Sequence, residues 1–134
     1  MRRQLLAAIV VLGVLGVLVV VALASGRTLD AGGRETVAAP IDKIEILIRE
    51  SNPPQVTAKI SAGLNGGCAL QDSHTVSRAG DTITISVLNS MPSGRPVCTA
   101  IYGTYELNVD LGTSFAIGTT YTVRVNDKVT TFKI

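Results

Sequence analysis

The residues of this chain that could do acid, base or nucleophilic chemistry centre on one imidazole. His74 is the only histidine, and Asp72 and Ser73 directly precede it. A catalytic triad brings serine, histidine and carboxylate together in space, and three neighbours in one extended segment do not form a triad by spacing. We therefore predict that His74 lies at a surface or a sheet edge, and that the chain is not an enzyme.

Catalytic and metal-binding motifs point the same way. Neither Ser73 nor Ser86 stands in a Gly-x-Ser-x-Gly setting, and no glycine-rich phosphate loop precedes a helical pattern. The acidic residues occur singly, without the Asp-x-Asp-x-Asp run that binds calcium. His74 and Met91 are residue types found in copper sites, but two ligands are too few to define one. We expect no metal and no cofactor.

The two cysteines, Cys68 and Cys98, are an even number and both follow the apolar N-terminal segment. An even count in an exported chain favours a disulfide, and thiolate binding of a metal would need more ligands than one histidine supplies. Closing a loop of this size stabilises a fold by roughly 3.5 to 4 kcal/mol in the chain-entropy model. We predict the disulfide Cys68–Cys98.

The segment 89–97 is the candidate binding loop. It combines Met91, Pro92, Arg95 and Pro96 directly before Cys98. A loop held by a disulfide loses little entropy on binding, so it can present a recognition surface. The alternative is that the segment is only a long crossover between strands.

The N-terminus differs from the rest of the chain. Residues 5–24 contain 18 apolar side chains and two glycines in 20 positions, and Arg2 and Arg3 precede them. Twenty helical residues span roughly 30 Å, enough to cross a bilayer. The arginines keep the N-terminus in the cytoplasm. We expect a single-pass membrane protein with its C-terminal domain outside the cytoplasm; the alternative is secretion after signal cleavage behind Ala24.

The net charge of the 134-residue chain is +2. Beyond residue 3, the 10 remaining Lys and Arg residues balance the 10 Asp and Glu residues. A nucleic-acid partner would need a basic stripe, which this balance does not provide. We expect no nucleic-acid binding.

The exported part is predicted to be all-β. Residues 25–40 are rich in small and polar types and predict a flexible tether, and residues 41–134 predict one domain. Apolar and polar residues alternate in the domain with the period of two that is typical of half-buried strands. The predicted strands cover residues 44–48, 56–64, 69–77, 82–88, 104–111, 121–125 and 129–134. Seven unequal strands favour a Greek-key sandwich over an up-and-down barrel.

The sequence also resembles a known group. The motifs Gly67-Cys68, Val76-x-Arg78-x-Gly80-Asp81-Thr82-Ile83, Cys98-Thr99 and Thr120-Tyr-Thr-Val-Arg-Val-Asn126 are similar to those of small exported bacterial immunoglobulin-like β-sandwich modules. The resemblance implies a seven-stranded immunoglobulin-like Greek-key sandwich. It also implies that Tyr121 is a structural corner residue, hydrogen-bonded to nearby backbone. The chain departs from antibody domains because it has no Trp and no cysteine near that corner.

Taken together, these patterns predict a membrane-tethered extracytoplasmic binding or structural module, attached to the membrane through residues 5–24. Its partner is expected to be a protein or a glycan of unknown identity, and its oligomeric state stays open. The alternative is an exported protease-inhibitor-like domain that uses the loop 89–97.

Overall fold

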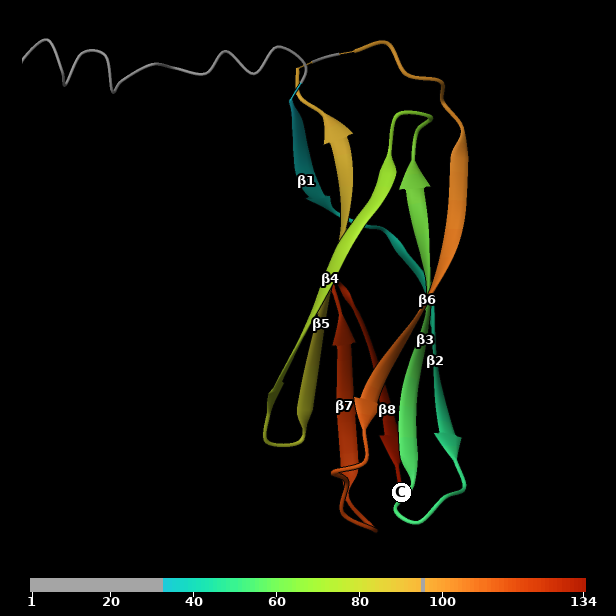
Figure 1. Ribbon diagram of the computed structural model, residues 1–134, viewed down its shortest axis with the longest axis vertical. Coiled ribbons are helices and arrows are strands. Elements are labelled where there is room, and N and C mark those ends of the chain that lie inside the picture. Colours follow the sequence, from blue (N-terminus) through green and yellow to red (C-terminus); the bar gives the residue numbers. More distant parts are fainter. Residues whose placement is uncertain (1–32, 95) are drawn as a thin grey trace, which may run out of the picture. The chain divides into compact units, whose positions relative to one another are not determined.

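The computed structural model describes residues 33–94 and 96–134, which form eight β-strands and no helix (Figure 1). The strands are β1 (Arg34–Ala38), β2 (Ile41–Arg49), β3 (Gln55–Asn65), β4 (Leu70–Ala79), β5 (Thr82–Pro92), β6 (Tyr102–Gly112), β7 (Thr120–Val125) and β8 (Lys128–Lys133). They make two sheets, so the predicted all-β sandwich is confirmed. The predicted anchor or signal segment 1–24 lies outside the described residues.

Within residues 33–94 and 96–134, no helix has the length and apolar character to cross a bilayer.

The smaller sheet is antiparallel and has the order β2-β3-β6. In the larger sheet, β4 pairs antiparallel with one edge of β5 along most of its length. The other edge of β5 is shared: β1 pairs antiparallel with residues 88–92, and β7 pairs parallel with residues 82–85. β8 then pairs with β7. The structure therefore differs from the predicted seven-stranded sandwich in two ways. β1 is an eighth strand, and β5 and β7 pair in parallel.

Asn126 joins β1 and β7 into one continuous edge partner of β5. Its φ of 49° lies in the left-handed region, which Asn tolerates better than most residues. The side-chain Nδ2 donates to the carbonyls of Ala39 (2.7 Å) and Val87 (2.9 Å), and Oδ1 accepts from the amide of Val87 (2.9 Å). The side-chain amide thus fills the place of the peptide group missing between the two strands.

The core lies between the sheets, where the predicted alternation is confirmed for the central strands. Alternate residues of β3, β5 and β7 are fully or nearly fully buried. The buried side chains from these strands include Val56, Ala58, Ile60, Ala62, Ile83, Ile85, Val87, Tyr121, Val123 and Val125. Ile44 and Ile46 of β2 pack against this cluster, and Ile48 at its end is exposed.

One expectation about the edges was wrong. The tether 25–40 was expected to be irregular, but residues 34–38 form β1, and residues 25–32 lie outside the described residues. All five side chains of β1 are exposed, so no apolar alternation marks the strand. The third predicted strand, residues 69–77, is present as β4, and every one of its side chains is exposed, including Leu70 and Val76. The opposite sheet is only three strands wide, and β4 extends beyond what it covers.

Candidate functional site

The predicted disulfide is present, and it joins two connections at one end of the sandwich. Cys68 lies between β3 and β4 and Cys98 lies between β5 and β6, with an S–S distance of 2.06 Å and a Cα–Cα distance of 5.6 Å. The amide of Gly67 also donates to the carbonyl of Thr99 (2.8 Å), and the amide of Gly66 donates to that of Ile101 (3.1 Å). We call this region, residues 66–69 and 93–101, the disulfide end; it is at the top of Figure 1.

Arg34 fastens β1 to the disulfide end. Its Nε donates to Oγ of Ser90 (2.6 Å), and its Nη2 donates to the carbonyls of Ser90 (2.8 Å) and Cys68 (2.8 Å). The amide of Ser93 donates to the carbonyl of Gly33 (2.8 Å), so the chain enters the described domain beside this end. Arg34 could not be predicted as part of the site, since no sequence pattern distinguishes it from the residues around it.

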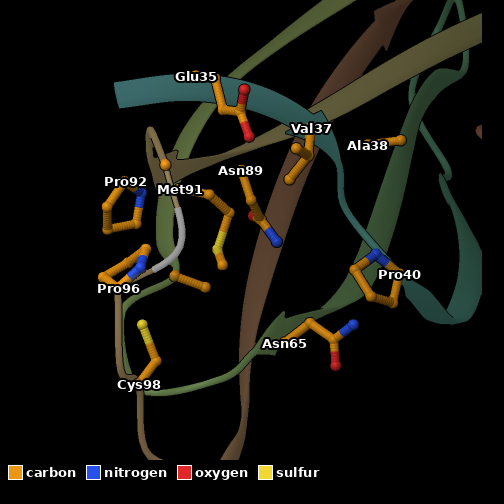
Figure 2. A pocket seen from close by; sticks show the side chains of 12 residues that line it. Glu35, Val37, Ala38, Pro40, Asn65, Asn89, Met91, Pro92, Pro96 and Cys98 are labelled. Atoms are coloured by element: carbon orange, nitrogen blue, oxygen red, sulfur yellow. The ribbon is translucent and has the colours of Figure 1, made fainter. Parts of the chain in front are cut away.

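A pocket of about 590 Å³ opens between β1, β5 and the connection 93–101 (Figure 2). This volume lies within the range of about 300–1,000 Å³ that is typical of small-ligand sites. The structure brings three of the four predicted loop residues, Met91, Pro92 and Pro96, to its wall. The fourth, Arg95, lies outside the described residues.

The segment 89–97 is not a loop throughout. Residues 89–92 belong to β5, since β1 pairs with them along their other edge. Pro92 has no N–H to donate to a neighbouring strand, and it is tolerated because it is the last residue of β5. The part of the predicted binding loop that lies outside β5 is therefore shorter than expected and begins at Ser93.

Asn89 forms the floor of the pocket. It is only 1% exposed, and both ends of its amide are hydrogen-bonded: Nδ2 donates to the carbonyl of Gly63 (2.8 Å), and Oδ1 accepts from the Tyr105 hydroxyl (2.6 Å). Burial raises the pKa of Tyr105, which keeps its phenol protonated as the donor. A buried polar group that is fully satisfied holds the strands in register. With both ends of its amide bonded within the protein, Asn89 gives structural support to the strands that line the pocket.

Four large apolar side chains that lie near the two cysteines in the chain are exposed. We call them the apolar rim: Leu70, Val97, Ile101 and Tyr102. Val97 is fully exposed, and the exposed fraction of Ile101 is 63%. The Tyr102 ring lies against Gly63, where a Cβ would collide with it. Its hydroxyl donates to Asp42 (2.8 Å), a hydrogen bond that raises the pKa of Tyr102. The rim is a feature that sequence alternation did not reveal.

The predicted surface position of His74 agrees with the structure. His74 is exposed on β4 and lies opposite Val87, so it shares a face with Val87 and not with Ser86. The Ser73 hydroxyl donates to Asp72 (2.7 Å) and not to the imidazole. Within residues 33–94 and 96–134, no group of three His, Cys, Asp or Glu side chains is placed to hold a metal ion.

Tyr121 lies at the other end of the sandwich, in an aromatic cluster. It is buried, its ring centroid is 5.0 Å from that of Phe115 and 5.4 Å from that of Phe132, and the Arg78 guanidinium lies over it and over Phe115. The amide of Ala116 donates to the Tyr121 hydroxyl (2.7 Å). This is the contact with nearby backbone that the resemblance implied. We call this region the aromatic end.

Comparison with known proteins places these features in a family. The model of the ORF11 beta-sandwich domain matches residues 58–134, which include both cysteines and Tyr121. An uncharacterized 10.2 kDa protein in the HgiCIIM 5' region of Herpetosiphon aurantiacus is 30% identical over 94 residues, covering 70% of this chain and 98% of that protein. No solved structure matches. The fold and the family match agree, and the chain belongs to the ORF11 β-sandwich domain family.

Proposed function

We propose that this chain is a non-catalytic, membrane-tethered extracytoplasmic module that binds its partner through the disulfide end. One observation carries the proposal. The pocket and the chain entry at Gly33 lie beside the Cys68–Cys98 bridge, and the four exposed residues of the apolar rim lie within four residues of its two cysteines in the chain. Val97 is fully exposed beside the bridge, and an exposed apolar side chain on a connection that a disulfide holds in place can contact a partner at little entropic cost.

The way this end is built supports a binding role. The disulfide and the backbone hydrogen bonds of Gly66 and Gly67 hold the two connections together before any partner arrives. A preorganised surface loses less conformational entropy on binding than a free loop does. The rigid support of this end therefore favours a role in recognition.

The proposed location depends on two sequence features. Residues 5–24 have the length and composition of a membrane anchor, and a disulfide persists in oxidising compartments outside the cytoplasm. The finer architecture that we propose is immunoglobulin-like, supported by the hydrogen bond at Tyr121. The parallel pair β5–β7 is a departure from that architecture.

The test has two parts. Membrane fractionation with intact-mass measurement, with and without reductant, should find the full-length chain in the membrane, two mass units lighter before reduction. A photo-crosslinking residue at Ile101 should then yield adducts with an envelope component in living cells, whereas the same residue at Ile117, 86% exposed at the aromatic end, should not. A soluble chain that begins at Ser25, or equal adducts from both positions, would contradict the proposal.

A second candidate is a protease inhibitor, and one observation favours it. Val97 is fully exposed between Pro96 and Cys98, on a connection tied down by the disulfide. A projecting, cross-linked loop can occupy a protease cleft without being cleaved quickly. Purified protein that inhibits no member of a panel of elastase-like, trypsin-like and chymotrypsin-like proteases would remove this candidate.

A further inference from the structure

We propose that two copies of this chain associate through β4, with the free edges of the two strands paired antiparallel about a two-fold axis at Thr75. The inference goes beyond the proposed function and does not depend on it, because it rests on the surroundings of β4 alone. An interface built by a two-fold axis uses the same surface on both copies, so every contact away from the axis occurs twice.

β4 is an edge strand whose side chains are exposed on both faces of the larger sheet. One of its edges pairs with β5, and no other described strand pairs with the second edge. All ten side chains of the strand are exposed. Its register with β5 shifts only at Asp72, so residues 73–79 form a regular stretch. A free edge of this kind presents unpaired N–H and C=O groups, which a second strand can satisfy.

The inner face of β4 carries an exposed apolar side chain. Val76 lies opposite Ile85 and His74 lies opposite Val87, and directly opposed residues share a face of the sheet. Ile85 and Val87 are fully buried, whereas Val76 is 45% exposed, because β4 extends beyond the three-stranded sheet. A second β4 beside the first places Val76 of each copy next to His74 of the other. The pairing therefore shields Val76 from water.

The side chains of β4 match one another under this symmetry. An axis at Thr75 places the two Thr75 side chains opposite each other and Ser73 opposite Ser77 of the other copy. It also places Asp72 opposite Arg78 of the other copy. Hydroxyl pairs and opposite charges are cross-strand contacts that stabilise antiparallel strands. Because the charge pair forms twice, the symmetric register satisfies both charges of each strand.

Both charged groups keep atoms available for this contact. Nε of Arg78 donates to the carbonyl of Gly80 (3.1 Å), and Nη1 donates to the carbonyl of Ser114 (2.8 Å). Oδ2 of Asp72 accepts from the Ser73 hydroxyl (2.7 Å). The contact between Asp72 and Arg78 of the other copy can use Oδ1 and Nη2, so it needs none of the atoms that these hydrogen bonds occupy.

The other edge strands do not offer such a match. β6 carries Glu106 and Asp110, and β8 carries Lys128 and Lys133, so pairing of either strand with its own copy about its centre brings like charges together. β2 lies beside β8, where Nζ of Lys128 donates to the carbonyl of Asp42 (2.8 Å). β1 is only five residues long. Among the described edges, that of β4 is therefore the one suited to a second copy.

The first test measures the association of the full-length protein in detergent by analytical ultracentrifugation, and we expect a monomer–dimer equilibrium. Asp72→Lys places like charges at both ends of the paired strands and should raise the dissociation constant by about tenfold. The matched control is Asp127→Lys, the same charge change at an exposed position in the turn between β7 and β8, which should leave the constant unchanged. Circular dichroism and intact mass verify that the fold and the bridge persist.

The second test uses single cysteines to read the register. Thr75→Cys lies on the axis, so two copies should form an intermolecular disulfide on mild oxidation, because opposed Cα atoms of an antiparallel pair lie within disulfide range. Ser73→Cys or Ser77→Cys alone should not cross-link, since the same residue of the other copy lies about 13 Å along the strand. A mixture of these two variants should. Thr131→Cys, exposed on the opposite edge strand β8, is the control and should stay monomeric.

Three results would overturn the inference. The first is a full-length chain that stays monomeric. The second is equal cross-linking of Thr75→Cys and Thr131→Cys, which shows collision and not pairing. The third is an assembly that Asp72→Lys leaves unchanged and that Thr75→Cys does not trap, because it associates through another surface. Membrane fractionation and crosslinking at Ile101 do not involve β4, so each of these results leaves the proposed function standing.

Discussion

The two ends of the sandwich are closed by different chemistry. The aromatic end is closed by packing: Phe115, Tyr121 and Phe132 stack and cross at centroid distances of 5.0 to 5.4 Å, with Arg78 over two of the rings. The disulfide end is closed by a covalent bridge and by hydrogen bonds to Asn89, and it leaves a pocket and an apolar rim. Because the disulfide stabilises the disulfide end, its apolar side chains need not be buried to hold the fold together, and they remain exposed to a binding partner.

The largest effect is expected from removing packing at the aromatic end. Phe132→Ala should lower the free energy of unfolding by about 3–5 kcal/mol, because it deletes a buried ring from the cluster. Urea denaturation followed by circular dichroism measures the change. Lys133→Ala, the exposed neighbour, is the control. A loss below about 1 kcal/mol would mean that this end is not held by packing.

Removing the bridge should cost about 3.5 kcal/mol. The double variant Cys68→Ser/Cys98→Ser loses the restriction that a loop of this length places on the unfolded chain. Because the two ends share no partners, combining it with Tyr121→Phe should give additive losses within about 0.5 kcal/mol. Clear non-additivity would show that the ends are coupled, which the comparison excludes.

The buried amide should matter less than the bridge. Asn89→Ala leaves the Gly63 carbonyl and the Tyr105 hydroxyl without their partner, and the expected loss is about 2 kcal/mol. Asn108→Ala on β6 is the matched control, because Asn108 is exposed. Thermal unfolding of the two variants makes the comparison, and equal midpoints would remove Asn89 from the support of the disulfide end.

A local effect is expected at β1. Arg34→Met removes three hydrogen bonds in a partly exposed setting, with an expected loss of about 1 kcal/mol. Amide hydrogen exchange should rise in residues 34–38 while β7 stays protected, since opening of an edge strand precedes global unfolding. Arg49→Met at the end of β2 serves as the control. Unchanged exchange in β1 would show that backbone pairing alone holds it.

The smallest effect concerns alkaline pH. Burial raises the pKa of Tyr105, so the folded state keeps a proton that the unfolded state releases. The resulting stability is present below a pH of about 10, the ordinary pKa of tyrosine, and is lost as the pH rises through the folded pKa. Tyr105→Phe should flatten the fall of the urea midpoint between about pH 9.5 and 11.5. A parallel fall in the wild type and the variant would contradict this.

The sequence predicted those features that the alternation of apolar and polar residues encodes, together with the disulfide. The inward residues of β3, β5 and β7 follow the period of two, and the bridge followed from a single pair of cysteines. Alternation could not predict β1, since all of its side chains are exposed. It also could not show that the neighbours of β4 are missing on the opposite sheet, because sheet width is a property of the whole fold.

The candidate site was predicted in part for the same reason. Met91, Pro92 and Pro96 stood out by type and by their distance from Cys98, and the structure places them on one pocket. The buried position of Asn89 depends on Gly63 and Tyr105, which are 26 and 16 residues away in the chain. Such long-range hydrogen bonds leave no local pattern.

The shared edge of β5 has a consequence for trimming of the chain. Along one edge of β5, the backbone of residues 88–92 pairs with β1 and with no other strand. The Asn126 side chain bridges the gap between β1 and β7. A chain cut to begin at residue 41 would expose this strand edge, and exposed strand edges pair with other molecules and aggregate. A protease that clips between residues 33 and 41 would have the same effect. Residues 33–40, which the sequence suggests are spacer, are thus expected to protect this strand edge from aggregation.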